Sequence, residues 1–249
     1  MEAAVAPLAV RSLSLAFGGL QALDGISLAL RAGERRAIIG TNGAGKTTLF
    51  NVINGQLAPT QGEIWLMGEN VTRLPTHKRA ARGLARTFQI TSLFPDLTVR
   101  QNMVLAVQAL DRCRFALHRT AESYRHVGER VRALLERWQL WQAREERVRN
   151  LSYGTQRQLE IVLALAGEPR ILLLDEPMAG LSAAETHLAT DIIMKLERSI
   201  TILLIEHDLE AAFRIADWIT ALDQGRIVAE GTPAEIRKEA HLQRIYLRK

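Results

Sequence analysis

The chain has 249 residues, of which 47% are hydrophobic, so it can bury a sizeable core in a single domain. Its apolar runs stop well short of the roughly eighteen residues that a membrane span needs, and the acidic second residue is not typical of a signal peptide, so we expect neither a membrane segment nor export. A net charge of +5 is compatible with every class of anionic partner. The single cysteine, Cys113, excludes an internal disulfide and favours a reducing compartment. The histidines are scattered along the sequence, which argues against a zinc site.

The opening third of the chain alternates predicted strands with turns. Residues 9–17 and 25–40 read as strand segments, and the second ends in β-branched residues directly before a glycine-rich loop. After the loop, residues 46–55 predict a short helix, which Gly55 ends in the position that a C-terminal glycine takes. A further strand at 62–68 returns the chain to a sheet.

From about residue 79 to 150 the strand signals fade and helical periodicity replaces them. Apolar residues recur at offsets of one helical face, and we expect them to form the core side of a helical insertion: Val127, Val131, Leu134, Leu135 and Trp138. Many arginines lie between 112 and 149, but acidic residues are interleaved and no stacking aromatics accompany them. This pattern favours a solvated helical surface over a nucleic-acid site.

Strands and helices alternate again after residue 150. The stretches 170–176 and 199–207 are short, apolar and bounded by breakers, as strands buried on both faces should be. Near the end, Thr232, Pro233 and Glu235 form the capping box of a helix. We therefore expect one mostly parallel α/β domain, with a core made of 1–78 and 151–249 and a helical subdomain at about 79–150.

The sequence GTNGAGKT matches the phosphate-binding pattern G-x-x-x-x-G-K-[ST] between a predicted strand and a predicted helix. In such a loop the backbone N–H groups surround the phosphates, Lys46 reaches the β- and γ-phosphates, and the Thr47 hydroxyl binds Mg²⁺. The expected nucleotide contacts in this loop are Gly40, Thr41, Asn42, Gly43, Ala44, Gly45, Lys46, Thr47 and Thr48.

Two acidic residues end the apolar strand RILLLDE, at the edge of the sheet where ligands collect in open α/β folds. Asp175 suits direct or outer-sphere binding of Mg²⁺, and Glu176 suits the polarisation of an attacking water. His207 follows the next buried strand and is expected at the same edge, whereas Gln89 taken alone could be any surface amide.

A second candidate anion site is LSYGTQRQLE, residues 151–160, where a turn runs directly into a helix. The phosphate loop, FQ, LSYGTQ, ILLLDEP, AGLS and IEHD occur in this order, and together they resemble the ATP-binding subunit of ABC transporters over nearly the whole chain. The stretches RTFQITSLFPDLTVRQN, LLDEPMAGLS and AEGTPAEI are most similar to the ATPases of bacterial branched-chain amino acid importers.

The resemblance implies a P-loop ATPase fold with an N-terminal antiparallel β part, and it implies a role for each matching residue. Phe17 is expected to stack on adenine, and Gln89 to meet Mg²⁺ and sense the membrane subunit. Asp175 is expected to assist the metal, Glu176 to act as the base for water, and His207 to contact the γ-phosphate. The implied cofactors are ATP and Mg²⁺.

In this family the signature turn caps the nucleotide of a second subunit, so Ser152 and Gly154 are expected to bind the partner's γ-phosphate at the positive end of a helix that starts near Thr155. The implied partners are a second ATPase subunit, identical or paralogous, permease subunits that dock on the helical insert and, indirectly, a solute-binding protein outside the cell. The implied location is the cytoplasmic face of the inner membrane, as a peripheral subunit with no nucleic-acid partner.

The signature departs from the commoner Leu-Ser-Gly-Gly-Gln at Tyr153 and Thr155, and Ser182 stands where aspartate is frequent. Alternatives within the family are a urea or amide importer and a lipopolysaccharide exporter. A soluble relative acting on nucleic acid or the ribosome suits the basic charge, but such relatives usually carry paired nucleotide domains or a long coiled coil. A P-loop kinase or GTPase lacks support, because the sequence has no guanine-reading Asn-Lys-x-Asp.

Overall fold

The computed structural model describes residues 5–87, 93–109, 111 and 124–239. In chain order, the elements up to the helical region are β1 (Leu8–Phe17), β2 (Leu20–Leu30), β3 (Arg35–Gly40), α1 (Lys46–Asn54), β4 (Gln61–Leu66), β5 (Glu69–Asn70), α2 (Thr76–Ala80) and β6 (Leu84–Arg86). The remaining ones are α3 (Val99–Ala109), α4 (Arg125–Arg137), the short 3₁₀-helix η3 (Val148–Asn150), α5 (Tyr153–Leu165), β7 (Ile171–Asp175), α6 (Ala183–Met194), β8 (Thr201–Ile205), α7 (Leu209–Ile215), β9 (Trp218–Asp223), β10 (Arg226–Gly231) and α8 (Pro233–Lys238).

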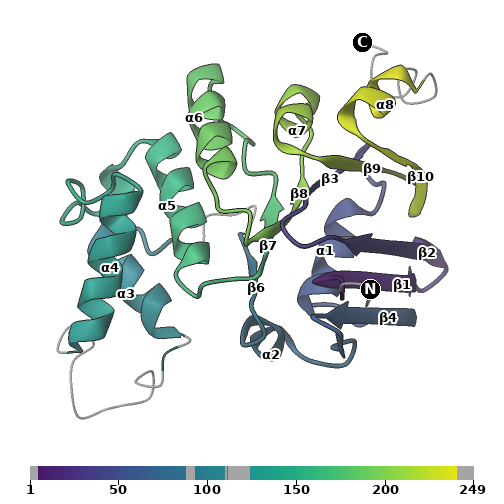
Figure 1. The fold of residues 1–249 in the computed structure, drawn as a ribbon, viewed down its shortest axis with the longest axis horizontal. Coiled ribbons are helices and arrows are strands. Elements are labelled where there is room, and N and C mark those ends of the chain that lie inside the picture. Colours follow the sequence, from purple (N-terminus) through teal and green to yellow (C-terminus); the bar gives the residue numbers. More distant parts are fainter. Residues whose placement is uncertain (1–4, 88–92, 110, 112–123, 240–249) are drawn as a thin grey trace.

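Within the described residues, the strands form two sheets. An antiparallel sheet has the order β2-β1-β4-β5, and the larger sheet has the order β10-β9-β3-β8-β7-β6. All neighbours in the larger sheet are parallel except β9 and β10. Figure 1 shows α1 beside the antiparallel sheet, whereas α3, α4 and α5 lie together at the opposite end of the molecule. A mostly parallel core with an N-terminal antiparallel part is therefore confirmed.

The central strands are apolar along their whole length because both faces of the larger sheet are covered. In β7, Leu172 and Leu174 belong to one buried cluster, whereas Ile171 and Leu173 belong to the other. Successive side chains of a strand point to opposite faces, so each cluster lies on its own side of the sheet. One side holds α1 and the antiparallel sheet, and the other holds α3 to α8.

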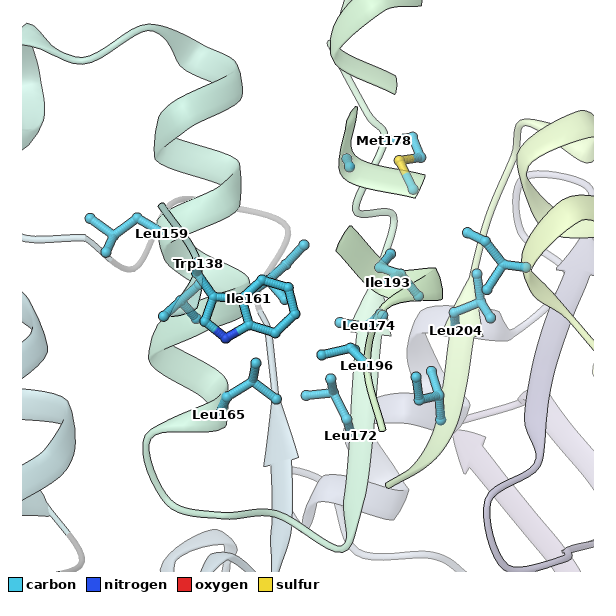
Figure 2. Packing of buried hydrophobic residues seen from close by; sticks show 14 of the residues in the cluster. Trp138, Leu159, Ile161, Leu165, Leu172, Leu174, Met178, Ile193, Leu196 and Leu204 are labelled. Carbon is cyan, nitrogen blue, oxygen red and sulfur yellow. The ribbon is translucent and has the colours of Figure 1, made fainter. Parts of the chain in front are cut away.

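The predicted helical face is confirmed. The apolar side of α4 and the tryptophan after it are buried: Val127, Val131, Leu134, Leu135 and Trp138. Figure 2 labels Trp138 with Leu159 and Leu165 of α5 and Leu172 of β7, which all belong to one buried cluster. Burial of such side chains contributes roughly 1.5–3 kcal/mol each. The same apolar core therefore joins the helical region to the sheet.

Three boundaries differ from the sequence-based expectation. The stretch 25–40 is two strands, because the chain turns between β2 and β3 at Gly33, which has a φ of +72° and lies against the backbone of Arg198. The short β6 pairs with β7 although it lies in the range expected to be helical. The signature helix α5 starts at Tyr153 rather than near Thr155, because Ser152 caps it. The subdomain boundary near residue 79 stays a prediction.

Both helices that follow a Ser/Thr-x-x-Glu pattern begin with a capping box. In α8 the expected box forms between Thr232 and Glu235, with Pro233 in the first turn. In α6 the same arrangement links Ser182 and Glu185. Among the helices that the structure describes, none combines the length and the hydrophobicity needed to cross a membrane.

Candidate nucleotide site

The phosphate loop lies between the end of β3 and the first turn of α1. Gly45 precedes the helix with a φ of +99°, a conformation that side chains with a Cβ rarely adopt. A Cβ built on Gly45 would lie 2.7 Å from the carbonyl oxygen of Ala22, so only glycine fits here. No side chain caps α1 and its first turn holds no acidic residue. The first N–H groups of α1 are thus left for an anion.

Lys46 is almost fully buried in this loop. Its Nζ donates hydrogen bonds to the carbonyl oxygens of Gly40 at 2.7 Å and Thr41 at 2.9 Å. Burial lowers the pKa of Lys46, and the negative charges of Glu176 and Asp175 partly oppose that shift. The ammonium group is therefore held at the loop, close to both carboxylates.

A cleft of ≈1220 Å³ opens beside the loop and brings together residues from distant parts of the chain. Its lining includes Lys46 and Thr47 of α1, Glu176 after β7, and His207 after β8. The exposed side chain of Phe17, at the end of β1, lines the same cleft. Strands β7 and β8 end at the carboxyl edge of the larger sheet, where open α/β folds bind ligands, and α1 begins there after β3.

Glu176 and His207 contact each other directly. His207 Nε2 lies 2.7 Å from Glu176 Oε1, and the Glu176 side chain is largely buried whereas that of His207 is half exposed. Glu176 has a φ of +48°, and its N–H donates to the carbonyl oxygen of Ile205 in β8. The left-handed backbone conformation of Glu176 ends the extended run of β7 and directs the carboxylate toward His207.

Asp175, the last residue of β7, is fully buried and is not among the described residues that line the cleft. Its Oδ2 accepts a hydrogen bond from Arg86 at 2.6 Å. Its Oδ1 is buried without a hydrogen-bond partner among the residues described. A buried carboxylate oxygen left in this way, near enough to Lys46 for its charge to act on the pKa of that lysine, suits a hard cation such as Mg²⁺. Gln89, the third expected metal residue, lies outside the described residues.

The signature turn forms a separate group of polar contacts. Ser152 Oγ accepts a hydrogen bond from the Thr155 N–H at 3.2 Å and lies 2.9 Å from Thr155 Oγ1. The Gly154 N–H donates to Glu185 Oε1 at 3.1 Å, and the Tyr153 hydroxyl donates to the carbonyl oxygen of Ala179 at 3.3 Å. The described residues lining the phosphate-loop cleft include neither Ser152 nor Gly154. The two candidate anion sites are therefore not parts of one cleft in this chain.

Sequence reasoning missed Arg86 and Glu185. Arg86 binds Asp175 and also donates to Asn51 at 2.7 Å and to Gln56 at 2.9 Å, so it joins β6 and β7 to the end of α1. Only its position three residues before Gln89 hinted at a role. Glu185 had a usable signal, since Ser182 and Glu185 have the spacing of a capping box. Its second contact, with α5, follows only from the packing.

Comparison with known proteins identifies the family. The ABC transporter family matches residues 23–179, which is more than half of the chain. The high-affinity branched-chain amino acid transport ATP-binding protein BraF of Pseudomonas aeruginosa is 40% identical over 247 residues, which cover 96% of this chain and 97% of that protein. The lipopolysaccharide export system ATP-binding protein LptB of Escherichia coli is 32% identical over 244 residues, 98% of each chain.

A solved structure shares the whole fold. It is the ADP conformation of an ATP-binding cassette of an ABC transporter, with a TM-score of 0.84 and 27% identity, and the match covers 98% of this chain and 99% of that chain. The order of motifs, the cleft at the phosphate loop and these similarities agree. The chain therefore belongs to the ABC transporter family, as one of its ATP-binding subunits, and is an ATPase.

Proposed function

We propose that the chain hydrolyses Mg²⁺-bound ATP in a head-to-tail dimer and thereby powers the import of branched-chain or related amino acids through separate permease subunits. The observation that carries the nucleotide part is the cleft in which Lys46, Glu176 and His207 meet at the uncapped N-terminus of α1. A positively polarised helix end and a buried ammonium group suit the phosphates, and a carboxylate suits the water.

The residues of the cleft divide the work. Lys46 exchanges its loop carbonyl partners for oxygens of the β- and γ-phosphates, and Phe17 at the mouth of the cleft offers a face for adenine. Glu176 accepts the proton of the water that attacks the γ-phosphorus, while the leaving ADP keeps the bridging electron pair. His207, whose Nε2 lies 2.7 Å from Glu176 Oε1 in the single chain, turns this nitrogen to a γ-phosphate oxygen and donates to it when ATP is bound.

Thr47 and Asp175, together with Gln89, are the residues proposed to hold Mg²⁺. The orphaned Oδ1 of Asp175 is the observation that supports this, because a buried acceptor without a donor is costly unless something else occupies it. When bound, Mg²⁺ neutralises part of the charge on the β- and γ-phosphates. Arg86 keeps the Asp175 side chain in one orientation through the salt bridge to Oδ2.

The second half of each site comes from a second ATPase subunit, either another copy of this chain or a paralogue. Ser152 and Gly154 stand at the first turn of α5 and do not line the chain's own cleft. We propose that they bind the γ-phosphate held by the partner. Hydrogen bonds to charged groups contribute roughly 1.5–3 kcal/mol each, so dimerisation should depend strongly on that phosphate.

Two variants test the nucleotide mechanism. Glu176→Gln removes the base but keeps the shape, so ATP binding should persist while hydrolysis stops and a dimer accumulates on a sizing column with Mg²⁺ and ATP. Ser152→Arg should leave ATP binding to the single chain intact and abolish hydrolysis. If Glu176→Gln stays monomeric with Mg²⁺ and ATP, both alone and with its copurifying ATPase partner, the proposed dimer is contradicted. If Ser152→Arg hydrolyses ATP at a near-normal rate, the proposed role of the signature turn in the partner's site is contradicted.

The transported solute is proposed from the relatives. BraF is named for branched-chain amino acid transport and is 40% identical to this chain, whereas LptB, named for lipopolysaccharide export, is 32% identical. We place the chain on the cytoplasmic face of the membrane, bound to permease subunits that face a solute-binding protein.

Purification of the chain from membranes should recover the permease subunits with it. In vesicles that contain the assembled transporter, ATP hydrolysis should rise when leucine and the binding protein are added. Stimulation by lipopolysaccharide, or recovery with nucleic acid, contradicts the amino acid proposal.

A further inference from the structure

Glu185 makes hydrogen bonds in two directions, and this links two motifs of the site. Its Oε2 accepts from the N–H of Ser182 at 2.9 Å and from the Ser182 hydroxyl at 2.7 Å, which closes the capping box of α6. Its Oε1 accepts from the N–H of Gly154 at 3.1 Å, in the first turn of α5. One carboxylate therefore ties the segment after Glu176 to the signature turn.

The Gly154 N–H is one of the donors that the proposed dimer needs for the partner's γ-phosphate. In the single chain an anionic oxygen of Glu185 already accepts from it. The carboxylate also covers the glycine, because a Cβ built on Gly154 would lie 2.9 Å from both Cγ and Oε1 of Glu185. A phosphate oxygen and this carboxylate cannot share the same N–H, since two anions in hydrogen-bond contact repel each other.

The carboxylate is ionised at neutral pH. Hydrogen bonds from the Ser182 hydroxyl and backbone, together with the one from Gly154, hold the pKa of Glu185 below its usual value. The residue is only partly buried, so its side chain has solvent on one side into which it can turn. Ser182 remains available to hold Oε2 while Oε1 leaves Gly154.

A second contact runs in parallel. The Tyr153 hydroxyl donates to the carbonyl oxygen of Ala179, and the Ala179 N–H donates to the carbonyl oxygen of Glu176 at 3.0 Å. The signature turn is thus joined at two points to the segment that starts at Glu176. A change at Gly154 therefore has a short covalent and hydrogen-bonded route to the base.

We propose that Glu185 is a positioning residue that occupies the Gly154 N–H in the single chain and yields it to the γ-phosphate of the partner's ATP when the dimer closes. The inference rests on the proposed head-to-tail dimer. It makes the carboxylate an internal competitor of the phosphate, so that ATP must displace it and the carboxylate returns to Gly154 after hydrolysis and phosphate release.

The test measures the dissociation constant of the ATP-bound dimer by analytical ultracentrifugation, in a Glu176→Gln background that stops turnover. Glu185→Gln removes the charge and Glu185→Ala removes the competitor entirely. We expect both to tighten the dimer, and loss of one competing charge-assisted hydrogen bond corresponds to about tenfold or more. ATP affinity of the single chain should stay unchanged, since Glu185 does not line its cleft.

The matched control is Glu235→Gln and Glu235→Ala in α8, where Thr232 and Glu235 form the same capping box away from the signature turn. These variants lose the same kind of helix cap, so they should lower thermal stability without tightening the dimer. A dimer that is unchanged or weakened by both Glu185 variants overturns the inference and leaves Glu185 as a helix cap. If the Glu176→Gln parent does not dimerise with ATP, alone or with its copurifying ATPase partner, the proposed dimer itself fails.

Discussion

Glu206 is a buried carboxylate directly before His207. Its Oε1 accepts from the N–H of Met178 at 3.0 Å and its Oε2 from the N–H of His207 at 3.2 Å, so it fixes the backbone on both sides of the Glu176–His207 contact. Burial raises the pKa of Glu206 to about 7, although these backbone N–H groups oppose the shift. The loss of solvation thus outweighs the hydrogen bonds.

This pKa predicts how stability depends on pH. Between about pH 4.5 and pH 7 the folded chain keeps the Glu206 proton that the unfolded chain has lost. The contribution of the protonated Glu206 to the free energy of unfolding is therefore fully present below about pH 4.5 and is lost as pH rises through about 7. In Glu206→Gln the group cannot ionise. Relative to the parent, the free energy of unfolding of the variant should therefore rise by about 3 kcal/mol between about pH 4.5 and pH 8.

Urea denaturation at a series of pH values measures this difference directly. The comparison of slopes against pH cancels any constant cost of exchanging an acid for an amide. Equal slopes in the parent and in Glu206→Gln between about pH 4.5 and pH 8 contradict the raised pKa of Glu206.

At the residue scale, the sequence predicted the groups that stand at strand ends. Lys46, Glu176 and His207 each follow a buried strand or a glycine loop, and the structure collects them in one cleft. Arg86 and Glu185 could not be predicted in their full roles, because their partners Asp175 and Gly154 are 89 and 31 residues away in the chain. Such contacts depend on how the helices pack on the sheet and not on a local pattern.

At the element scale, the phosphate loop joins β3 to α1 through glycines that differ in their surroundings. Gly43 has a φ of +82° and open space where a Cβ would stand, whereas at Gly45 the same position lies 2.7 Å from the Ala22 carbonyl oxygen. The conformation is unfavourable for alanine at both, but only Gly45 adds a backbone clash. A comparison of alanine substitutions at Gly43 and Gly45 therefore distinguishes the cost of the left-handed backbone conformation from the cost of the steric clash.

We expect Gly43→Ala to lower the free energy of unfolding by about 1–2 kcal/mol, which is the cost of a left-handed conformation in a residue with a Cβ. Gly45→Ala should cost about 1–3 kcal/mol more, because the β2 backbone or α1 must move. Urea denaturation without nucleotide measures both and keeps phosphate contacts out of the comparison. Equal losses in the two variants contradict the role of the Ala22 contact.

The element pattern shows what the sequence could and could not predict. Long apolar strands such as β7 and the periodic face of α4 were predictable, since their signals extend over several residues. The three-residue β6 was not, because its pairing with β7 supplies what its own sequence lacks. The turn between β2 and β3 was hidden because Gly33 lies between two segments that both read as strands.

At the scale of the whole molecule, the two anion sites belong to opposite sides of the larger sheet. Residues of α1 pack in the cluster shared with the antiparallel sheet, and residues of α5 pack in the cluster shared with α3 and α4. Figure 1 shows these two helices separated by the strands of the sheet. The sequence predicted both motifs, but only the fold explains why the signature turn does not line the chain's own cleft.

This separation predicts that two inactive chains can restore each other. Lys46→Ala impairs the phosphate loop and Ser152→Arg impairs the signature turn, so neither variant alone forms an intact site. In a head-to-tail pair of one chain of each kind, the loop of the Ser152→Arg chain meets the signature turn of the Lys46→Ala chain, and one complete site results. ATP hydrolysis, measured by phosphate release, should therefore reappear on mixing.

The control is a mixture of chains that both carry Lys46→Ala and Ser152→Arg, which cannot form an intact site in any pairing and should stay inactive. Specific activity of the unaltered chain should also rise with protein concentration, because a site made by two molecules is lost on dilution. If the mixed single variants stay inactive while the unaltered chain hydrolyses ATP alone, pairing between two copies of this chain is contradicted. If ATP hydrolysis returns only when the Lys46→Ala and Ser152→Arg chains are mixed, each active site is made by two molecules, because a site formed within one chain cannot be restored by another chain.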